Sequence, residues 1–193
     1  MTLIRENCIR SLKDNQVQDH FGINFQELLF IKKINLRIDP NNNFHISTCG
    51  KILETILPTK PNTYIENDKF KIIWLSPDEW LIINKKETNL LKNLGKELGN
   101  KDSSVTDITE NRTIIRISGK QIYTLLSKFL TLDLEKNLSI TSTCAQTLFI
   151  KVPVLLVNNY NKNQDPQIDI FVNRSHSNYV YKLLVDGAKN LNF

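Results

Sequence analysis

One order of predicted elements occurs twice along this chain, and it limits the folds that the sequence can adopt. In the first half, apolar and polar residues alternate over 31–38, as in a half-buried strand. Segment 47–57 carries apolar residues at helical spacing before a proline, and segments 70–75 and 80–83 are typical of strands. Segment 87–98 then places leucines on one helix face and stops at a glycine. The predicted order is strand, helix, strand, strand, helix.

The same order returns in the second half of the chain. Segment 113–117 predicts a strand, and a Ser-Gly pair leads from it into an apolar helix. Segment 147–157 predicts one long apolar strand, segment 168–172 a further strand, and segment 175–189 a final helix. The two halves share the order of their elements rather than their residues, which still indicates a duplicated unit.

Each half alone would form a small open sheet with helices on one face, leaving a sheet edge and an apolar surface uncovered. Pairing the halves side by side would cover both. We therefore expect an α+β fold of two pseudo-duplicated units, with mostly antiparallel sheets and packed helices. The predicted boundaries are an N-terminal arm over 1–28 and a single domain over 29–193, divided into half-units 29–100 and 101–193. The arm lacks sustained periodicity, so we expect it to be mobile unless a partner covers it.

Composition and charge exclude several classes of protein. Hydrophobic residues make up 40% of the chain and charged residues 23%, as in an ordinary globular protein. The 25 basic and 20 acidic side chains leave a net charge of +5, and the lysines are scattered. Because nucleic-acid binding needs clustered cations with interleaved aromatic residues, we expect no nucleic-acid partner. The apolar runs are too short to span a bilayer and the first residues lack the apolar core of a secretion signal. We expect a cytoplasmic protein without a membrane partner.

The usual signatures of catalysis and cofactor binding do not occur in the sequence. The six glycines never take the spacing that cradles a pyrophosphate, and no histidine or cysteine pair has metal-ligand spacing. The three cysteines are odd in number and widely separated, which is typical of reduced thiols. Cys144 could serve as a nucleophile, although a small buried thiol is the more common role. We predict no catalytic residue, cofactor-binding residue or metal ligand in this chain.

The segment around the two tryptophans permits a structural and a functional interpretation. Ser76 and Glu79 have the spacing of a capping box, and Pro77 has a helix-compatible φ, so one tight helical turn between two strands is expected. Trp74 and Trp80 would then flank the turn and pack into the core. The functional alternative is an interface anchor, because aromatic residues concentrate at binding hot spots.

Three further segments suggest local structure or a contact. Asp107 and Arg112 bracket a turn and could pair across it, although an exposed pair contributes less than about 1 kcal/mol. Pro153 lies inside an apolar run, which favours an edge strand or a bulge because proline cannot donate to the ladder. Ser175 is a plausible N-cap, which leaves Arg174 free to contact a partner.

Four ordered motifs, which together cover more than half of the chain, carry a resemblance to a known family. They are WLSPDEWLI (74–82), VTDITENRTIIRISG (105–119), CAQTLFIKVPVLL (144–156) and DIFVNRSHSNYVYKLL (169–184). With these motifs the chain resembles the gamma subunit of heterotetrameric sarcosine oxidase.

The resemblance implies a fold, a set of partners and a reaction. The fold would be similar to the folate-binding domain of aminomethyltransferases. The complex would oxidise sarcosine to glycine with formation of H2O2 and, with tetrahydrofolate, methylenetetrahydrofolate. FAD, FMN, NAD and tetrahydrofolate would bind in the partner subunits and no cofactor in this chain. The gamma subunit would contact the alpha subunit directly, with beta and delta subunits in the same complex.

Two hypotheses follow for the function. The first is a non-catalytic subunit whose task is assembly, and the expected interface residues are Trp74, Asp78, Glu79, Trp80, Asp107, Arg112 and Arg174. The alternative is a folate-dependent aminomethyltransferase-like enzyme or a folate-binding protein. No carboxylate of this chain matches the folate-binding carboxylate of the aminomethyltransferases.

Overall fold

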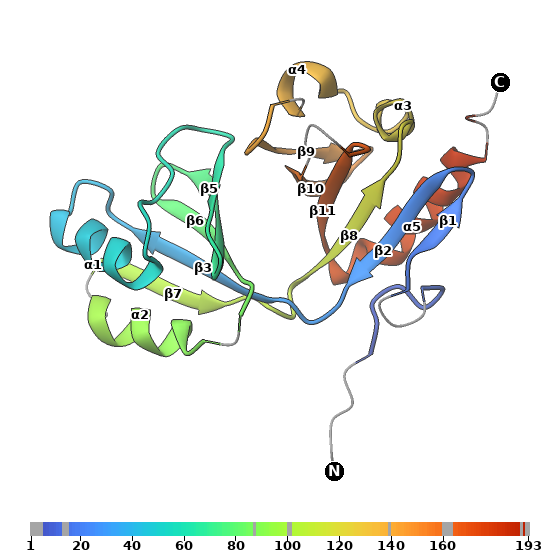
Figure 1. Cartoon of the computed structure of the whole chain (residues 1–193). Coiled ribbons are helices and arrows are strands. Elements are labelled where there is room, and N and C mark those ends of the chain that lie inside the picture. Colours follow the sequence, from blue (N-terminus) through green and yellow to red (C-terminus); the bar gives the residue numbers. More distant parts are fainter. Residues whose placement is uncertain are drawn as a thin grey trace, which may run out of the picture. The chain divides into compact units, whose positions relative to one another are not determined.

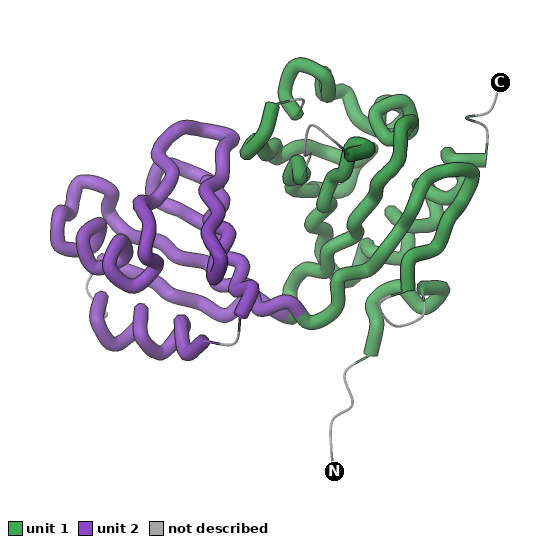
Figure 2. Tube along the Cα trace, in the orientation of Figure 1, with its two compact units in different colours: residues 1–30, 110–193 green, residues 31–109 purple. Residues whose placement is uncertain are grey.

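The computed structural model describes residues 6–12, 16–86, 88–99, 102–138, 140–159, 164–189 and 191. The chain forms two compact units (Figures 1 and 2). Unit 1 contains residues 1–30 and 110–193, and unit 2 contains residues 31–109. Since unit 2 is an uninterrupted segment, unit 1 is built from the two ends of the chain.

Unit 2 is built on a five-stranded antiparallel sheet in the order β4-β5-β6-β3-β7. Its strands are β3 (Lys32–Ile38), β4 (Tyr64–Glu66), β5 (Phe70–Ser76), β6 (Glu79–Asn84) and β7 (Ser103–Asp107). Alternate residues of β3, β5 and β6, among them Leu36, Ile72 and Ile82, are fully buried in the core of the unit. This burial is the physical basis of the period-two pattern in the sequence.

Two helices complete the core of unit 2. Helix α1 (Asn43–Leu53) begins where the Asn42 side chain accepts hydrogen bonds from the amides of Phe44 and His45, at 3.0 and 3.3 Å. It ends at Leu53, and its C-cap Glu54 has a left-handed φ of 55°, so the helix predicted over 47–57 lies about one turn too late. Helix α2 (Leu90–Leu98) ends at Gly99, as the sequence predicts.

Unit 1 is built on a six-stranded antiparallel sheet in the order β1-β2-β8-β11-β10-β9. Its strands are β1 (Gln18–His20), β2 (Ile23–Leu28), β8 (Arg112–Ser118), β9 (Cys144–Phe149), β10 (Val152–Asn158) and β11 (Gln167–Asn173). The segment predicted as one strand over 147–157 is therefore a hairpin of two strands. Ile150 lies between the two strands and adopts a positive φ of 57°, which turns the chain. Because isoleucine is typical of strands, the sequence pattern gave no sign of this turn.

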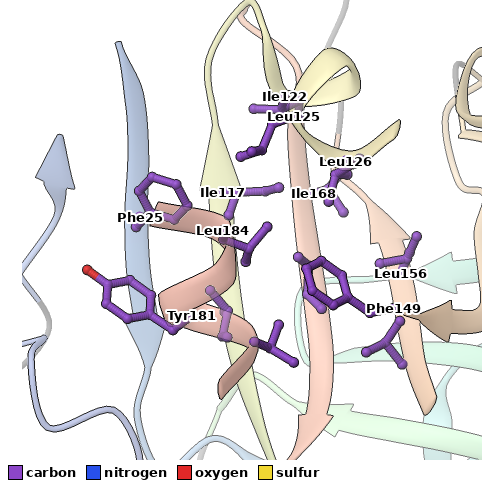
Figure 3. Packing of buried hydrophobic residues seen from close by; sticks show 14 of the residues in the cluster. Phe25, Ile117, Ile122, Leu125, Leu126, Phe149, Leu156, Ile168, Tyr181 and Leu184 are labelled. Carbon is purple, nitrogen blue, oxygen red and sulfur yellow. The ribbon is translucent and has the colours of Figure 1, made fainter. Parts of the chain in front are cut away.

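Helices α3 (Ile122–Ser127), α4 (Leu134–Leu138) and α5 (Arg174–Ala188) belong to unit 1. Leu125 of α3 and Leu184 of α5 meet the strand residues Ile117, Ile168 and Leu156 in the larger hydrophobic core (Figure 3). Helix α5 begins one residue before the predicted cap Ser175. Its N-cap is Asn173, without a side-chain capping bond, so the predicted serine cap is wrong.

The duplication extends to the topology of the sheets. Unit 2 orders its strands β4-β5-β6-β3-β7, and unit 1 orders the corresponding strands β9-β10-β11-β8-β2 before adding β1. The position of β7, which follows its unit's last helix in sequence, is taken in unit 1 by β2 from the beginning of the chain. The expected α+β fold with antiparallel sheets is confirmed.

The boundaries of the units differ from the predicted half-units 29–100 and 101–193. Strand β7 belongs to unit 2 because it pairs with β3, from Ile34 opposite Asp107 to Ile38 opposite Ser103. Strand β2 belongs to unit 1 because it pairs with β8. The open edges are therefore covered by strands at the start and middle of the chain, which the repeated pattern did not include.

The segment predicted as an arm, 1–28, contributes to the core of unit 1 in its described residues. Ile9 and Leu12 are 0% and 1% exposed, and strands β1 and β2 lie within the segment. The side chain of Glu27, 2% exposed, accepts the amides of Cys8 and Ile9 at 3.2 and 3.0 Å. These contacts argue against the mobile arm that the sequence suggested, because they give residues 8–12 buried apolar area and a fixed carboxylate partner.

Pro153 was predicted to lie in an edge strand or a bulge. The strand is not an edge strand, but Pro153 itself is paired on one side only. Strand β10 lies between β9 and β11, so it is not an edge strand. Pro153 nevertheless pairs only with Leu148 of β9, because pairing with β11 begins one residue later, at Val154. The missing amide is therefore tolerated at the end of the strand.

Candidate interface in unit 2

The β5–β6 hairpin brings four of the predicted interface residues together. Trp74 lies opposite Trp80, and Ser76 opposite Glu79, with a register irregularity between the two pairs. Only Pro77 and Asp78 stand between the strands, so the connection is a tight hairpin turn. The helical turn and capping box predicted from the sequence are wrong, because β5 and β6 pair up to the turn itself.

Polar contacts hold the turn in place. The Ser76 hydroxyl donates to Asp78 Oδ1 at 2.6 Å, and Arg37 Nη2 of β3 lies 2.9 Å from Asp78 Oδ2. The Ser76 hydrogen bond and the Arg37 guanidinium lower the pKa of Asp78. The Asn35 side chain donates to Glu79 Oε1 at 2.6 Å. The two predicted acidic residues are thus fixed by neighbours on β3.

An apolar groove of about 480 Å³ lies next to this turn. Pro77 and the two tryptophans line it from the hairpin, and residues before, within and after α1 complete the lining. The groove includes Pro40, Ile46, Ile56, Leu57 and Pro61. We call this surface the tryptophan groove.

The two tryptophans have different roles in the tryptophan groove. Trp80 is 1% exposed and its indole nitrogen donates to the Pro58 carbonyl at 2.8 Å, so it belongs to the core. Trp74 is only partly buried, and Ile56 on the facing wall is 75% exposed. An apolar groove bordered by fixed polar side chains has the composition of a protein-binding surface.

The sequence pattern missed Ile56 as part of this surface. It assigned Ile56 to the core face of a helix over 47–57, but α1 ends at Leu53 and leaves Ile56 in the following loop. Pro58 disfavours a helical conformation only at Leu57, and no pattern in the sequence marks the earlier end of the helix at Leu53.

The remaining predicted residues lie outside the tryptophan groove. Asp107 ends β7 and its carboxylate accepts the Thr109 amide at 2.8 Å. Arg112 begins β8 in unit 1, opposite Asn173. Arg174 forms an ion pair with Glu110, and its Nη2 donates to the Glu6 carbonyl at 3.3 Å. The structure thus does not gather the seven residues into one patch, and the pairing of Asp107 with Arg112 stays a prediction.

The cysteines are free thiols in an apolar environment. Burial raises the pKa of both Cys49 and Cys144 to about 12. A nucleophilic thiolate is therefore disfavoured at Cys144. Within the described residues, no three His, Cys, Asp or Glu side chains gather as a metal site requires. None of the described helices is long and apolar enough to cross a membrane.

The fold of this chain is shared by two solved structures. The fold matches the glycine cleavage system aminomethyltransferase T of Bartonella henselae with a TM-score of 0.61 at 11% identity, over 86% of this chain and 46% of that one. It matches a chain of the heterotetrameric sarcosine oxidase of Corynebacterium sp. U-96 with a TM-score of 0.79 at 21% identity, over 93% and 90% of the two chains. The chain therefore shares its α+β fold with part of aminomethyltransferase T and with a chain of heterotetrameric sarcosine oxidase.

Sequence comparison then identifies the family. A sequence model of the sarcosine oxidase, gamma subunit family matches residues 37–190. The sarcosine oxidase subunit gamma of Corynebacterium sp. (strain P-1) is 27% identical over 140 residues, which cover 69% of this chain and 66% of that relative's length. The chain belongs to the sarcosine oxidase gamma subunit family, and the resemblance found in the sequence is confirmed.

Proposed function

We propose that this chain is a non-catalytic subunit of a heterotetrameric sarcosine oxidase and that its task is to support assembly of the complex. The observation that carries the proposal is the tryptophan groove in a member of the gamma subunit family. Trp74 is a partly buried indole beside fixed polar side chains, and tryptophan is among the residues most enriched at binding hot spots. Trp74 is accordingly the proposed anchor on the alpha subunit.

The cofactors and the reaction follow from the same proposal. FAD, FMN, NAD and tetrahydrofolate bind in the partner subunits, and the complex of alpha, beta, gamma and delta subunits oxidises sarcosine to glycine with release of H2O2 in the cytoplasm. Capture of the one-carbon unit as methylenetetrahydrofolate takes place in the alpha subunit. The buried, protonated thiols and the dispersed polar residues of this chain support a role without chemistry of its own.

The test is co-expression of this chain with the alpha, beta and delta subunits, followed by size-exclusion chromatography. Trp74→Ala is expected to reduce co-elution with the alpha subunit at least tenfold, because truncation of a central tryptophan costs about 2 kcal/mol or more. Phe44→Ala is the matched control, since Phe44 is 61% exposed in the same unit and lies outside the groove lining. Undiminished co-elution of Trp74→Ala would contradict the docking role of the groove. Separate elution of the unaltered chain would contradict the subunit role itself.

A folate-binding or aminomethyltransferase-like function is the second candidate, and the fold match to aminomethyltransferase T is the observation that favours it. Calorimetric titration of the isolated chain with tetrahydrofolate separates the two. Micromolar binding would support this candidate, whereas no heat of binding is expected for an assembly subunit.

A further inference from the structure

A second groove, of about 570 Å³, lies in unit 1 between strand β1 and helix α5. Gln18 and His20 line it from β1. Tyr179, Lys182 and Leu183 line it from α5, at the spacing of one helix face. A groove between an edge strand and a helix is the geometry in which domains bind an extended peptide as an added strand.

Strand β1 is the outermost strand of its sheet and pairs with β2, from Gln18 opposite Phe25 to His20 opposite Ile23. Directly opposed residues lie on one face of a sheet, so Gln18 and His20 share the face of the core residues Ile23 and Phe25. A further strand would lie about 4.8 Å beyond β1 and would direct alternate side chains into the groove beside α5.

The floor of the groove is held by contacts within unit 1. The Tyr181 hydroxyl lies 3.2 Å from Gln18 Oε1 and 3.3 Å from His20 Nε2, which ties α5 to β1. The Tyr181 ring meets Phe25 edge-on, with centroids 5.9 Å apart (Figure 3 shows both rings). The groove is therefore formed before any ligand enters, which lowers the ordering cost of binding.

Exposed apolar side chains flank the three-residue edge strand β1, whose central residue is the exposed Asp19. Val17, immediately before β1, is 57% exposed, and Phe21, immediately after it, is 47% exposed. Tyr179 on the facing helix is 49% exposed. Edge strands of stable monomers are normally short or guarded by charge, proline or a covering element. Strand β1 is short and carries the exposed Asp19, but the exposed apolar residues on both sides of it still indicate a surface that becomes covered.

The charged side chains on this face of α5 indicate the charge of the segment that would bind. Asp186 pairs with Lys189 at 3.0 Å, so these two side chains neutralise each other. Lys182, exposed on the same face, forms no ion pair among the described residues. A carboxylate on the incoming segment would complement it.

We infer that the β1–α5 groove binds an extended segment of a partner subunit as an additional strand beside β1. The segment carries a carboxylate opposite Lys182 and an apolar side chain against Tyr179 and Leu183. This inference rests on the proposed function, because a subunit of the complex supplies the segment. It concerns a different unit from the tryptophan groove and makes a separate prediction.

Hydrogen exchange followed by mass spectrometry tests the inference, on this chain alone and in the assembled complex. Amides of residues 16–22 are expected to exchange at least tenfold more slowly in the complex. Lys182→Glu is expected to raise the dissociation constant of this chain from the partner subunits about tenfold, because the new carboxylate repels the carboxylate of the bound segment. Lys136→Glu is the control, since Lys136 is exposed on α4 and away from the groove lining.

An assembled complex in which residues 16–22 exchange as fast as in the free chain would overturn the inference and leave the subunit role intact. An equal effect of Lys182→Glu and Lys136→Glu would overturn the assigned carboxylate contact. If no complex forms with the unaltered chain, the proposed function fails and the inference fails with it.

Discussion

Trp74 and Trp80 are direct partners across the β5–β6 hairpin, yet only Trp80 is enclosed, at 1% exposure with its indole nitrogen on the Pro58 carbonyl. Two residues of the same type, on the same face of the same hairpin, therefore divide between the core and the surface of the tryptophan groove. Their contributions to stability should differ accordingly.

Trp80→Phe should lower the free energy of unfolding by about 1–3 kcal/mol, because the buried Pro58 carbonyl loses its donor and the smaller ring leaves space. Trp74→Phe should change it by less than about 0.5 kcal/mol, since the partly exposed ring donates no described hydrogen bond. Urea denaturation of the two variants checks this. Equal losses would show that Trp74 is also a core residue.

The buried carboxylate of Glu27 predicts how residues 8–12 are held. It accepts the amides of Cys8 and Ile9 and, at 2.6 Å, the Thr113 hydroxyl. In Glu27→Gln one acceptor oxygen becomes a donor that faces another donor, so a loss of about 2 kcal/mol is expected. Limited proteolysis should cleave residues 6–12 faster in this variant.

Glu135→Gln serves as the control for Glu27→Gln, because Glu135 is exposed on α4. It should leave both the stability and the cleavage pattern unchanged. Rapid cleavage of residues 6–12 in the unaltered chain would instead restore the mobile arm that the sequence suggested.

The sequence predicted well the helices and strands whose bounds depend on their own residues rather than on distant partners. Strand β11 was placed to within a residue at each end because four of its five central residues, Ile168, Ile170, Phe171 and Val172, are apolar and buried, with only Asp169 between them. Helix α2 was predicted to its last residue, Leu98, because Gly99 ends it in a positive φ.

The elements that the sequence missed depend on partners far along the chain. Strand β7 has mostly exposed side chains and forms because β3 offers its edge. Strand β2 carries a buried carboxylate, Glu27, at a core position, which breaks the apolar pattern and is explained only by the amides of residues 8 and 9. The periodicity of a short segment carries no information about β3 as the partner of β7 or about residues 8 and 9 as the partners of Glu27.

The candidate site shows the same division. The hairpin from Trp74 to Trp80 was singled out correctly as one segment. The groove beside it was not predicted, because its far wall comes from Pro40 and Ile56, whose proximity is a result of the tertiary fold. For the same reason the sequence grouped Arg174 with Asp78, which the structure assigns to different units.

Arg116 and Asp169 form a bidentate ion pair between β8 and β11, with distances of 2.7 and 2.9 Å. The Asp169 side chain is only 7% exposed. Asp169→Ala should lower the free energy of unfolding by about 1–3 kcal/mol, because Arg116, whose side chain is 32% exposed, loses the carboxylate that pairs with it. Thermal or urea denaturation measures the loss.

The double variant Arg116→Met with Asp169→Leu removes both charges and should recover most of that stability. A double variant as unstable as Asp169→Ala would show that the pair contributes through the fit of the strands rather than through the isolated charge.

The high pKa values of Cys49 and Cys144 predict a loss of stability in alkali. In the unfolded chain these thiols ionise near the ordinary cysteine pKa of 9.0, whereas burial keeps them protonated in the folded chain up to a pKa of about 12. The unfolded state therefore binds fewer protons as the pH rises through 9, and the free energy of unfolding falls. Urea midpoints at about pH 8 and about pH 10 measure the slope.

The variant with alanine at both Cys49 and Cys144 should lose part of that slope. At about pH 8 both thiols should also resist iodoacetamide until urea is added. Rapid alkylation of the folded chain would contradict the burial of these side chains.

Adding a single methyl group at Gly119, which follows β8, should affect stability differently from the same change at another glycine. Its φ is +143°, and a Cβ there would lie 2.7 Å from the Gly22 carbonyl oxygen, so alanine would be strained and would collide with backbone. Gly119→Ala should lower the free energy of unfolding by about 2 kcal/mol or more. Gly95→Ala should raise it by about 0.5–1 kcal/mol, because Gly95 lies inside α2 with nothing within 4 Å of the added methyl group. Urea denaturation of both variants gives two opposite signs from the same chemical change, and a neutral Gly119→Ala would mean that the turn before β2 yields to the methyl group at no cost.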